Sequence, residues 1–257
     1  MPLKTTEAFV LDVRKLQEAD RLVSFFTEDE GKIKGVAASA ARSRRRFGGK
    51  LERLSRVRVT YFEKEGRELA RIDACDLLDE SFTLHQDLRT ATTLSYVAEV
   101  IDTFARERES DTRYFRLIKS LIAAMKQGGD ARLLARYFEI WTLRLHGLMP
   151  ELDRCGGCGR DVTKPGGGGA IVEAGDMPVA LCPACRRSAG PAAGRTLTLS
   201  SSSLAVIDGF RKLPPAELAK TPAGPAVMAE LESFGVTMLT SFVGHGFKSH
   251  RFMKELG

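Results

Sequence analysis

The chain has 257 residues, of which 43% are hydrophobic and 28% charged, with five cysteines and a formal net charge of +6. This length allows two domains, and the composition is that of a globular chain, which excludes general disorder. Met1-Pro2-Leu3-Lys4 leads into charged sequence without the apolar segment of a signal peptide, and no later stretch approaches the 18 apolar residues of a membrane-spanning helix. We therefore expect a cytoplasmic protein with no membrane partner.

The first 80 residues predict a small β-barrel. In the clearest strand, Val57, Val59 and Tyr61 alternate with basic, polar or aromatic residues, so that one face is apolar. Further runs with strand signals are residues 7–13, 21–27, 32–38 and 68–74. Turn signals separate the runs at residues 28–31, 47–49 and 64–67. Five strands at this spacing favour an OB-type barrel.

Beyond Asp87 the apolar period changes to that of amphipathic helices. Helices are predicted around residues 94–104, 114–125, 130–145, 204–210 and 225–242. Asp130 is a candidate N-cap of the third helix, and a basic tail at residues 247–251 follows the last. We expect an α+β multidomain protein with an N-terminal OB-fold barrel in residues 1–80 and an α-helical domain in residues 81–257.

Two Cys-x-x-Cys pairs are the strongest chemical signal. Together they can supply four thiolates to one tetrahedral ion, as in a zinc ribbon inserted into the helical domain at about residues 152–190. The four candidate ligands are Cys155, Cys158, Cys182 and Cys185. We predict one structural zinc ion per chain, with two disulfides or a redox dithiol as the alternatives. A catalytic zinc is not favoured, because four thiolates close the coordination sphere.

Glycines accompany the first cysteine pair. Gly156, Gly157 and Gly159 supply the backbone freedom that a tight turn between paired thiols needs. The 23 residues between the pairs include a glycine-rich excursion at residues 164–169, which absorbs the extra length. The fifth cysteine, Cys75, stands alone and is expected to be a small buried strand residue.

Basic residues concentrate between Gly31 and Arg58, a segment that contains ten of them and a single acidic residue, Glu52. A long basic loop that leads into a strand with a basic face predicts contact with a nucleic-acid backbone. The candidates for this contact are Lys32, Lys34, Arg42, Arg44, Arg45, Arg46, Lys50, Arg56 and Arg58. Phe47 and Phe62 either stack on bases or belong to the core.

Recognisable catalytic motifs are missing from the sequence, including phosphate-binding loops, nucleophile elbows and His-Glu-x-x-His. The four histidines are scattered, and the acidic cluster at residues 28–30 reads as a turn or, in a nuclease, as a metal site. We therefore predict a binding protein that is not an enzyme. The alternatives are an RNA- or ribosome-associated zinc-ribbon protein and a metal-dependent nuclease.

In its motifs and their order, the chain resembles the RecO family of bacterial recombination mediators. The pieces that carry the resemblance are Glu18-Ala19-Asp20-Arg21-Leu22, Phe26-Thr27, Gly31-Lys32, Tyr96-Val97-Ala98-Glu99, Phe138-Glu139, Leu145-His146-Gly147-Leu148-Met149-Pro150, Leu152-Asp153-Arg154-Cys155 and Lys248-Ser249. In this family the basic loop usually begins with a Gly-Ala-Arg-Arg-like segment, whereas in this chain it begins with Ala38-Ser39-Ala40-Ala41-Arg42. Some relatives lack the cysteines, which argues for a structural metal.

The resemblance implies an OB fold, a helical domain with an inserted ribbon, and a function in DNA repair. Such proteins bind single- and double-stranded DNA, anneal strands coated by single-strand-binding protein, and cooperate with RecR to load RecA, without consuming nucleotide. A nucleoid-associated location follows. Family members also dock the acidic C-terminal tail of single-strand-binding protein on the helical domain. Arg116, Lys119, Arg132 and Arg136 are candidates for that docking, as basic positions expected to be exposed on the predicted helices.

Overall fold

The computed structural model describes residues 3–63, 66–164, 168–175, 177–192, 194–218 and 223–255. The chain packs into two compact units, residues 1–122 with 247–257 and residues 123–246. Two residues of the predicted turn at 64–67, Lys64 and Glu65, lie outside the described residues, as do Pro165, Gly166 and Gly167 of the glycine-rich excursion.

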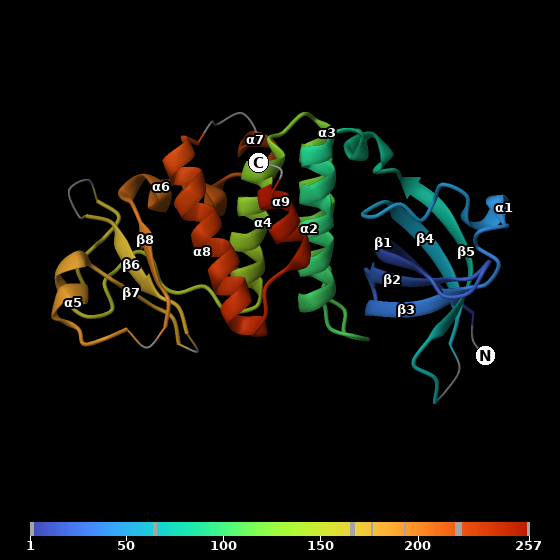
Figure 1. The fold of residues 1–257 in the computed structure, drawn as a ribbon, viewed down its shortest axis with the longest axis horizontal. Coiled ribbons are helices and arrows are strands. Elements are labelled where there is room, and N and C mark those ends of the chain that lie inside the picture. Colours follow the sequence, from blue (N-terminus) through green and yellow to red (C-terminus); the bar gives the residue numbers. More distant parts are fainter. Residues whose placement is uncertain are drawn as a thin grey trace. The chain divides into compact units, whose positions relative to one another are not determined.

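The first unit contains a closed five-stranded barrel with the strand order β1-β2-β3-β5-β4 (Figure 1). Its strands are β1 (Leu3–Lys15), β2 (Arg21–Thr27), β3 (Gly31–Ala37), β4 (Arg56–Phe62) and β5 (Ala70–Asp79). Only β3 and β5 pair in parallel, and β1 pairs with both β2 and β4. This confirms the predicted OB-type barrel, although β1 is longer at both ends than predicted and β5 runs on to Asp79.

The alternation along β4 places its apolar side chains inside the barrel. Val57, Val59 and Tyr61 are fully buried, whereas Arg58 between them is exposed. A fully buried valine or phenylalanine stabilises the fold by about 1.5–3 kcal/mol, so the alternation fixes which face of each strand turns inward. Cys75 on β5 is also fully buried, as predicted.

Part of the barrel's outer surface is covered by α2 (Leu88–Phe104) and by the part of α3 (Thr112–Lys126) that belongs to the same unit. The rings of Phe9 on β1 and Phe115 on α3 lie 4.9 Å apart, and those of Phe26 on β2 and Tyr114 lie 5.6 Å apart. These outward aromatic residues need cover because an exposed aromatic patch is unfavourable in water. A short 3-10 helix, η1 (Phe82–Gln86), precedes α2.

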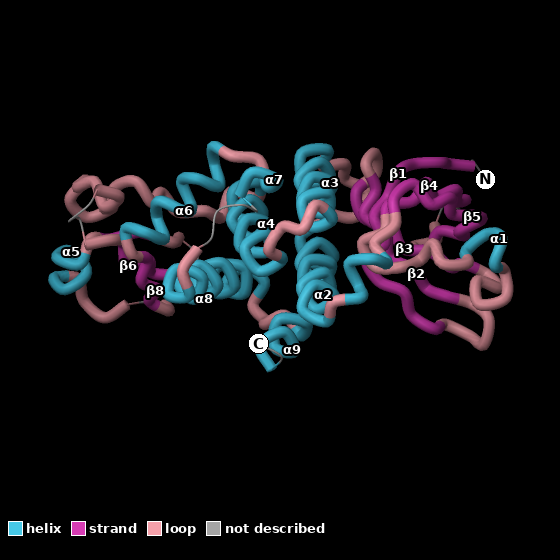
Figure 2. Tube along the Cα trace, turned by 90° about the horizontal axis from the view of Figure 1, so that it is seen from above, coloured by secondary structure: helices cyan, strands magenta, loops and turns pink. Residues whose placement is uncertain are grey.

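The segment expected to be a basic tail is a helix, α9 (Lys248–Glu255), which lies beside α2 (Figure 2). The backbone amides of Lys248 and Ser249 donate to the Glu99 carboxylate on α2 at 2.9 and 2.8 Å. Phe247, before the helix, packs edge-on against Tyr96 at 5.7 Å. The prediction of a tail was wrong because the cap of this helix comes from 149 residues earlier in the chain.

The second unit combines a helical core with a small sheet. Its elements are α4 (Ala131–Leu145), β6 (Ala170–Glu173), β7 (Val179–Leu181), α5 (Pro183–Ser188), β8 (Thr196–Leu199), α6 (Ser201–Lys212), α7 (Pro215–Leu218) and α8 (Pro225–Val243). As predicted, Asp130 caps α4 by accepting from the Leu133 amide at 2.9 Å, and Gly147 follows its end with φ +71°. The sheet order is β7-β6-β8.

A buried charged group joins α4 to α8. Arg136 pairs with Glu139 at 2.7 Å and with Glu232 at 3.4 Å, and both Arg136 and Glu139 are almost fully buried. At Gly235 a Cβ atom would lie 2.3 Å from Glu139 Oε2, so this position leaves no room for a side chain. Removing one partner of such a group by mutation leaves an uncompensated buried charge, which lowers the free energy of unfolding by about 3–5 kcal/mol.

By length and composition α8 is able to cross a membrane, with 19 residues and a mean hydropathy of 1.3. No such segment was expected from the sequence, so this expectation was wrong. In the second unit α8 packs on α4, α6 and β8, and Leu231, Phe234 and Leu239 are fully buried. Its Glu230 accepts from the amide and hydroxyl groups at the start of α6. The apolar side chains of α8 therefore pack against other elements of this unit.

The Glu99 cap predicts an acid-sensitive docking of α9. Burial raises the pKa of Glu99, but hydrogen bonds from Ser249 and Lys248 outweigh it and hold this pKa below its ordinary value. The stabilisation is therefore present above the unfolded pKa of about 4.3 and is lost as pH falls through the folded pKa. We expect Glu99→Gln to weaken α9 docking by about 0.5–2 kcal/mol at pH 7 and to remove this acid sensitivity.

Hydrogen exchange of the α9 amides against pH measures both effects. Glu255→Gln is the matched control, because Glu255 is exposed on α9 itself. Equal exchange rates in the two variants would contradict the capping role.

Candidate nucleic-acid interface and metal centre

The basic segment between β3 and β4 is anchored to the loop between β1 and β2. The Ser39 amide donates to Asp20 Oδ1 at 2.8 Å, and the Ala41 amide donates to the Ala19 carbonyl at 2.9 Å. The segment then forms one helical turn, α1 (Arg44–Phe47), where the sequence predicted only a loop. The Glu18–Leu22 motif thus positions the basic segment.

Arg46 is a structural part of this segment. Its guanidinium donates to the carbonyls of Ala38 and Asp73 at 2.9 and 3.4 Å and lies 5.0 Å from the centre of the Phe47 ring. Phe47 is buried in the barrel core. It is therefore a core residue and not a stacking platform for bases. Together, Arg46 and Phe47 fix α1 against the barrel.

Arg44 and Arg45 are the free cations of α1. Both are exposed, and their side chains form no ion pair with any described residue. The Lys50 ammonium donates to the Arg45 carbonyl at 2.9 Å and lies 3.8 Å from Asp76. Arg42 is exposed, 3.7 Å from the Glu18 carboxylate. The segment therefore presents guanidinium groups to solvent from a fixed backbone.

Arg56 and Arg58 share the outer face of β4, as the alternation predicts. Arg56 pairs with Glu7 at 2.6 Å, and Arg58 stands in register with Glu7 on one side and Asp76 on the other. Cross-strand neighbours of opposite charge attract each other. This face of β4 is consequently mixed in charge.

Lys32 and Lys34 lie at the end of β3 remote from the basic segment. Lys32 donates to the Asp102 carbonyl at 2.5 Å, and Lys34 pairs with Glu107 at 3.1 Å. These lysines bind the end of α2 and the segment after it. The nine predicted cations are thus divided among three places on the first unit.

The strand register reveals a transverse row of outward side chains that the sequence did not. Arg14 on β1, Leu22 on β2 and Val36 on β3 are successive partners, and the row continues to Arg71 on β5 and Phe62 on β4. Arg14 and Arg71 are exposed. No sequence pattern places them together, because the row depends on pairings between distant segments.

A groove of about 550 Å³ runs beside this row. Its lining combines cations with apolar surface and comprises Val36, Ala38, Arg67, Glu68, Leu69, Ala70 and Arg71. Arg46 binds the Ala38 carbonyl, so α1 borders the groove. Cations flanking an apolar surface are the chemistry that single-stranded nucleic acid requires, since phosphates and base faces are both accessible in it.

In the second unit, the four predicted cysteine ligands form one cluster, with all their Sγ atoms within 4.8 Å of one another. The Sγ atoms of Cys158 and Cys182 are 3.9 Å apart, close to the spacing of about 3.8 Å that tetrahedral Zn–S bonds of 2.3 Å give. The Cys182 amide donates to Cys155 Sγ at 3.1 Å. The cluster can hold a metal ion.

Local structure favours the thiolate form of Cys155. Burial alone would raise the pKa of Cys155, but the backbone amides of Cys182, Cys158 and Gly157 lower it to about 6. Gly159 has φ +70°, as the tight turn requires. At Gly157 a Cβ atom would lie 3.2 Å from Cys185 Sγ, so the close approach of the two cysteine pairs favours glycine there.

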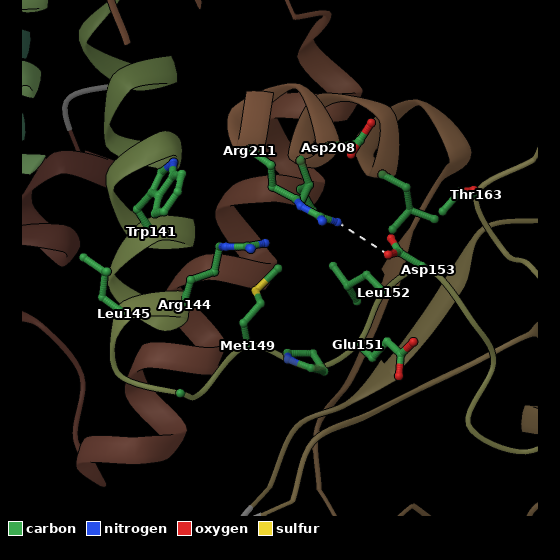
Figure 3. A pocket seen from close by; sticks show the side chains of 14 residues that line it. Trp141, Arg144, Leu145, Met149, Glu151, Leu152, Asp153, Thr163, Asp208 and Arg211 are labelled. Atoms are coloured by element: carbon green, nitrogen blue, oxygen red, sulfur yellow. Dashed lines mark hydrogen bonds and ion pairs between the residues drawn. The ribbon is translucent and has the colours of Figure 1, made fainter. Parts of the chain in front are cut away.

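A second concavity of about 480 Å³ lies between α4, α6 and the segment leading to the cysteines. Arg144 and Arg211 extend toward the space beside Met149 and Leu152 (Figure 3). Arg211 pairs with exposed Asp153 at 3.4 Å, while the Arg144 guanidinium lies 5.4 Å from the Trp141 ring. Burial and the charge of Arg211 lower the pKa of Arg144. The pocket offers an apolar wall and two cations, together with the carboxylates of Glu151, Asp153 and Asp208.

The basic positions expected to be exposed on the helices are not equivalent. Arg116, Lys119 and Arg132 are exposed, as expected. Arg136 is buried in its ion pairs with Glu139 and Glu232, so the expectation of exposure was wrong for this residue. Its closest partner, Glu139, lies three residues further along the same helix, whereas Glu232 comes from α8 and is not identified by the periodicity of α4.

Comparison with known proteins agrees with this architecture. Residues 1–81 match the family model Recombination protein O N terminal, and residues 85–251 match Recombination protein O C terminal. Relatives called DNA repair protein RecO include that of Koribacter versatilis, 44% identical over 160 residues, which are 62% of this chain and 65% of the relative. That of Anaeromyxobacter sp. strain K is 31% identical over 93% of this chain and 91% of the relative, and that of Myxococcus xanthus is 30% identical over 98% and 97%.

Fold and site define an OB-barrel protein that carries a helical unit and a four-cysteine cluster able to hold a metal ion. The chain belongs to the recombination protein O family of DNA repair proteins.

Thiol reactivity tests the cysteine cluster. In the native metal-bound protein we expect no thiol to react with a disulfide reagent, and removal of the metal by a chelator should release four reactive thiols. Cys75 should react only after unfolding, since burial raises its pKa to about 12. Metal analysis should return about one ion per chain, and Cys158→Ser should abolish binding whereas Cys75→Ala should preserve it. Disulfides without metal, in protein purified under reducing conditions, would overturn the assignment.

Proposed function

We propose that this protein is a non-catalytic DNA-binding mediator that anneals single strands and, with RecR, helps to load RecA onto DNA coated by single-strand-binding protein. The single observation that carries the proposal is the pair of exposed, unpaired guanidinium groups of Arg44 and Arg45 on α1, beside the groove lined by Arg71 and Val36. Backbone contacts of Asp20 and Arg46 hold this segment in place, so little ordering is needed on binding.

Annealing follows from charge neutralisation. Two DNA strands repel each other through their phosphates, and a cationic surface that replaces their counterions offsets this cost. The apolar part of the groove contacts base faces without reading sequence. No nucleotide is consumed in such a step, because pairing of the strands supplies the free energy.

The two parts of the chain divide the work in this proposal. Residues 1–80 bind single- and double-stranded DNA, and residues 81–257 recruit protein partners, with the ribbon at about residues 152–190 braced by one zinc ion. Matches to separate N- and C-terminal family models support this division. Four thiolates suit zinc, which needs no open position for a structural role. The protein works in the cytoplasm at the nucleoid.

The pocket beside Arg144 and Arg211 suits the acidic C-terminal tail of single-strand-binding protein. An apolar tip fits against Trp141 and Met149, and the acidic groups of the tail then face the two guanidiniums. Arg144 is the stronger attraction, because it is partly desolvated and forms no ion pair with a described residue, whereas Arg211 pairs with Asp153.

DNA affinity against salt concentration tests the α1 site. Arg44→Ala/Arg45→Ala should weaken binding of single-stranded DNA and reduce the slope of log affinity against log salt by about 0.7 for each lost phosphate contact. Arg113→Ala/Arg116→Ala, two exposed residues of α3, is the control with equal charge loss. If the salt slope of the α1 variant equals that of the wild type, α1 is not the DNA-binding site.

The same preparation separates the alternatives. Competition between DNA and RNA of one sequence should favour DNA, and preference for RNA would support the ribosome-associated reading. Cleavage of labelled DNA in the presence of magnesium or manganese would reveal a nuclease.

Binding of a labelled tail peptide tests the pocket. Arg144→Glu/Arg211→Glu should lower affinity at least tenfold, because both charges that face the acidic groups are reversed. Arg89→Glu/Arg251→Glu, two exposed residues of α2 and α9, reverses the same amount of charge and should leave affinity near wild type. Fluorescence anisotropy reports the affinity, and thermal melting checks folding. Equal affinity of wild type and the Arg144→Glu/Arg211→Glu variant would exclude this pocket.

A further inference from the structure

The metal ribbon carries its own group of unpaired cations. Arg154 precedes Cys155, Arg160 follows Cys158 by two residues, and Arg187 follows Cys185 by two. All three arginines are exposed, and no side-chain hydrogen bond or ion pair joins them to another described residue. We call these three residues the ribbon arginines.

Local structure gathers the ribbon arginines around one cluster. The backbones of Arg154 and Asp161 form an isolated β-bridge, and the Cys155 amide donates to the Arg160 carbonyl at 2.8 Å. Arg154 and Arg160 therefore belong to the same turn, that of the first cysteine pair. The Sγ atom of Cys185 lies within 4.8 Å of the sulfurs of that turn, which brings α5 and Arg187 to the same tip.

Neighbouring carboxylates are already engaged elsewhere. Asp153 pairs with Arg211, and Asp161 pairs with Lys164 at 3.6 Å and accepts from the Thr163 amide and hydroxyl at 2.9 and 2.7 Å. Glu173 pairs with Arg186 at 2.9 Å. The positive charge of the ribbon arginines is therefore not cancelled by these neighbours.

The arginines have one competing explanation, which is that they offset the negative charge of a metal tetrathiolate. The sulfur of Cys155, however, accepts hydrogen bonds from the backbone amides of Cys182 and Gly157. No guanidinium of the ribbon arginines donates to a sulfur, so each retains its full donor capacity toward an external anion.

We propose that the ribbon tip is a second nucleic-acid contact, which binds the phosphodiester backbone of a strand through Arg154, Arg160 and Arg187. Guanidinium groups match the bidentate geometry of phosphate. Residues 151–199 contain no aromatic residue or histidine, so the tip offers no stacking platform and contacts any sequence alike. The proposal rests on the DNA-binding function above and gives that function a contact in each unit, one for each of two strands.

The test uses the full metal-bound chain and a short oligothymidylate. Stoichiometric titration at low salt should show a second oligonucleotide bound by wild type and lost in Arg154→Ala/Arg160→Ala/Arg187→Ala, with binding of the first retained. The salt slope of the second event should fall by about 0.7 per lost contact. Metal content equal to wild type verifies that the ribbon is intact.

Arg113→Ala/Arg116→Ala/Arg132→Ala loses the same charge from exposed helical positions and should bind the second oligonucleotide normally. A ribbon variant that matches this control would overturn the proposal. In Arg44→Ala/Arg45→Ala the first event should weaken while the second persists. If instead that variant binds as wild type does, the α1 site fails while the ribbon contact stands or falls on its own variant.

Discussion

Pairing of β1 with β4 closes the barrel, and the other features of the first unit depend on this closure. β1 is long enough to pair with β2 along one edge and with β4 along the other, and its register shifts between Val10 and Asp12. Closure leaves no free sheet edge and assigns every side chain to the inside or the outside. On the outer face of the barrel, Phe9 and Phe26 are covered by helix α3, whereas Arg14 and Arg71 are exposed to solvent.

A local excess of cations in the sequence is not equivalent to a binding surface. Lys32 donates to the Asp102 carbonyl of α2, Arg56 pairs with Glu7 within the barrel, and Arg46 holds α1 to backbone carbonyls. Such contacts consume the donors that a phosphate would need. Arg44 and Arg45 remain available because they form no ion pair with a described residue, and the contacts of Arg46 keep their backbone in position.

Features set by neighbours along the chain could be predicted from the sequence, and features set by distant segments could not. The strand alternation of Val57 to Tyr61, the cap at Asp130 and the two cysteine pairs follow from local spacing. Helix α9 depends on Glu99, the link from Arg136 to α8 depends on Glu232, and the outward row depends on cross-strand register. In each of these cases the energy comes from a partner that sequence periodicity does not identify.

Annealing of complementary strands already coated by single-strand-binding protein is the most direct test of the proposed function. Fluorescence energy transfer between end-labelled strands follows the reaction. The wild-type protein should accelerate annealing without added nucleotide, and Arg44→Ala/Arg45→Ala should slow it markedly while the folded protein and its metal remain intact. Annealing no faster than in the absence of the protein, or unaffected by the loss of both arginines, would contradict the account.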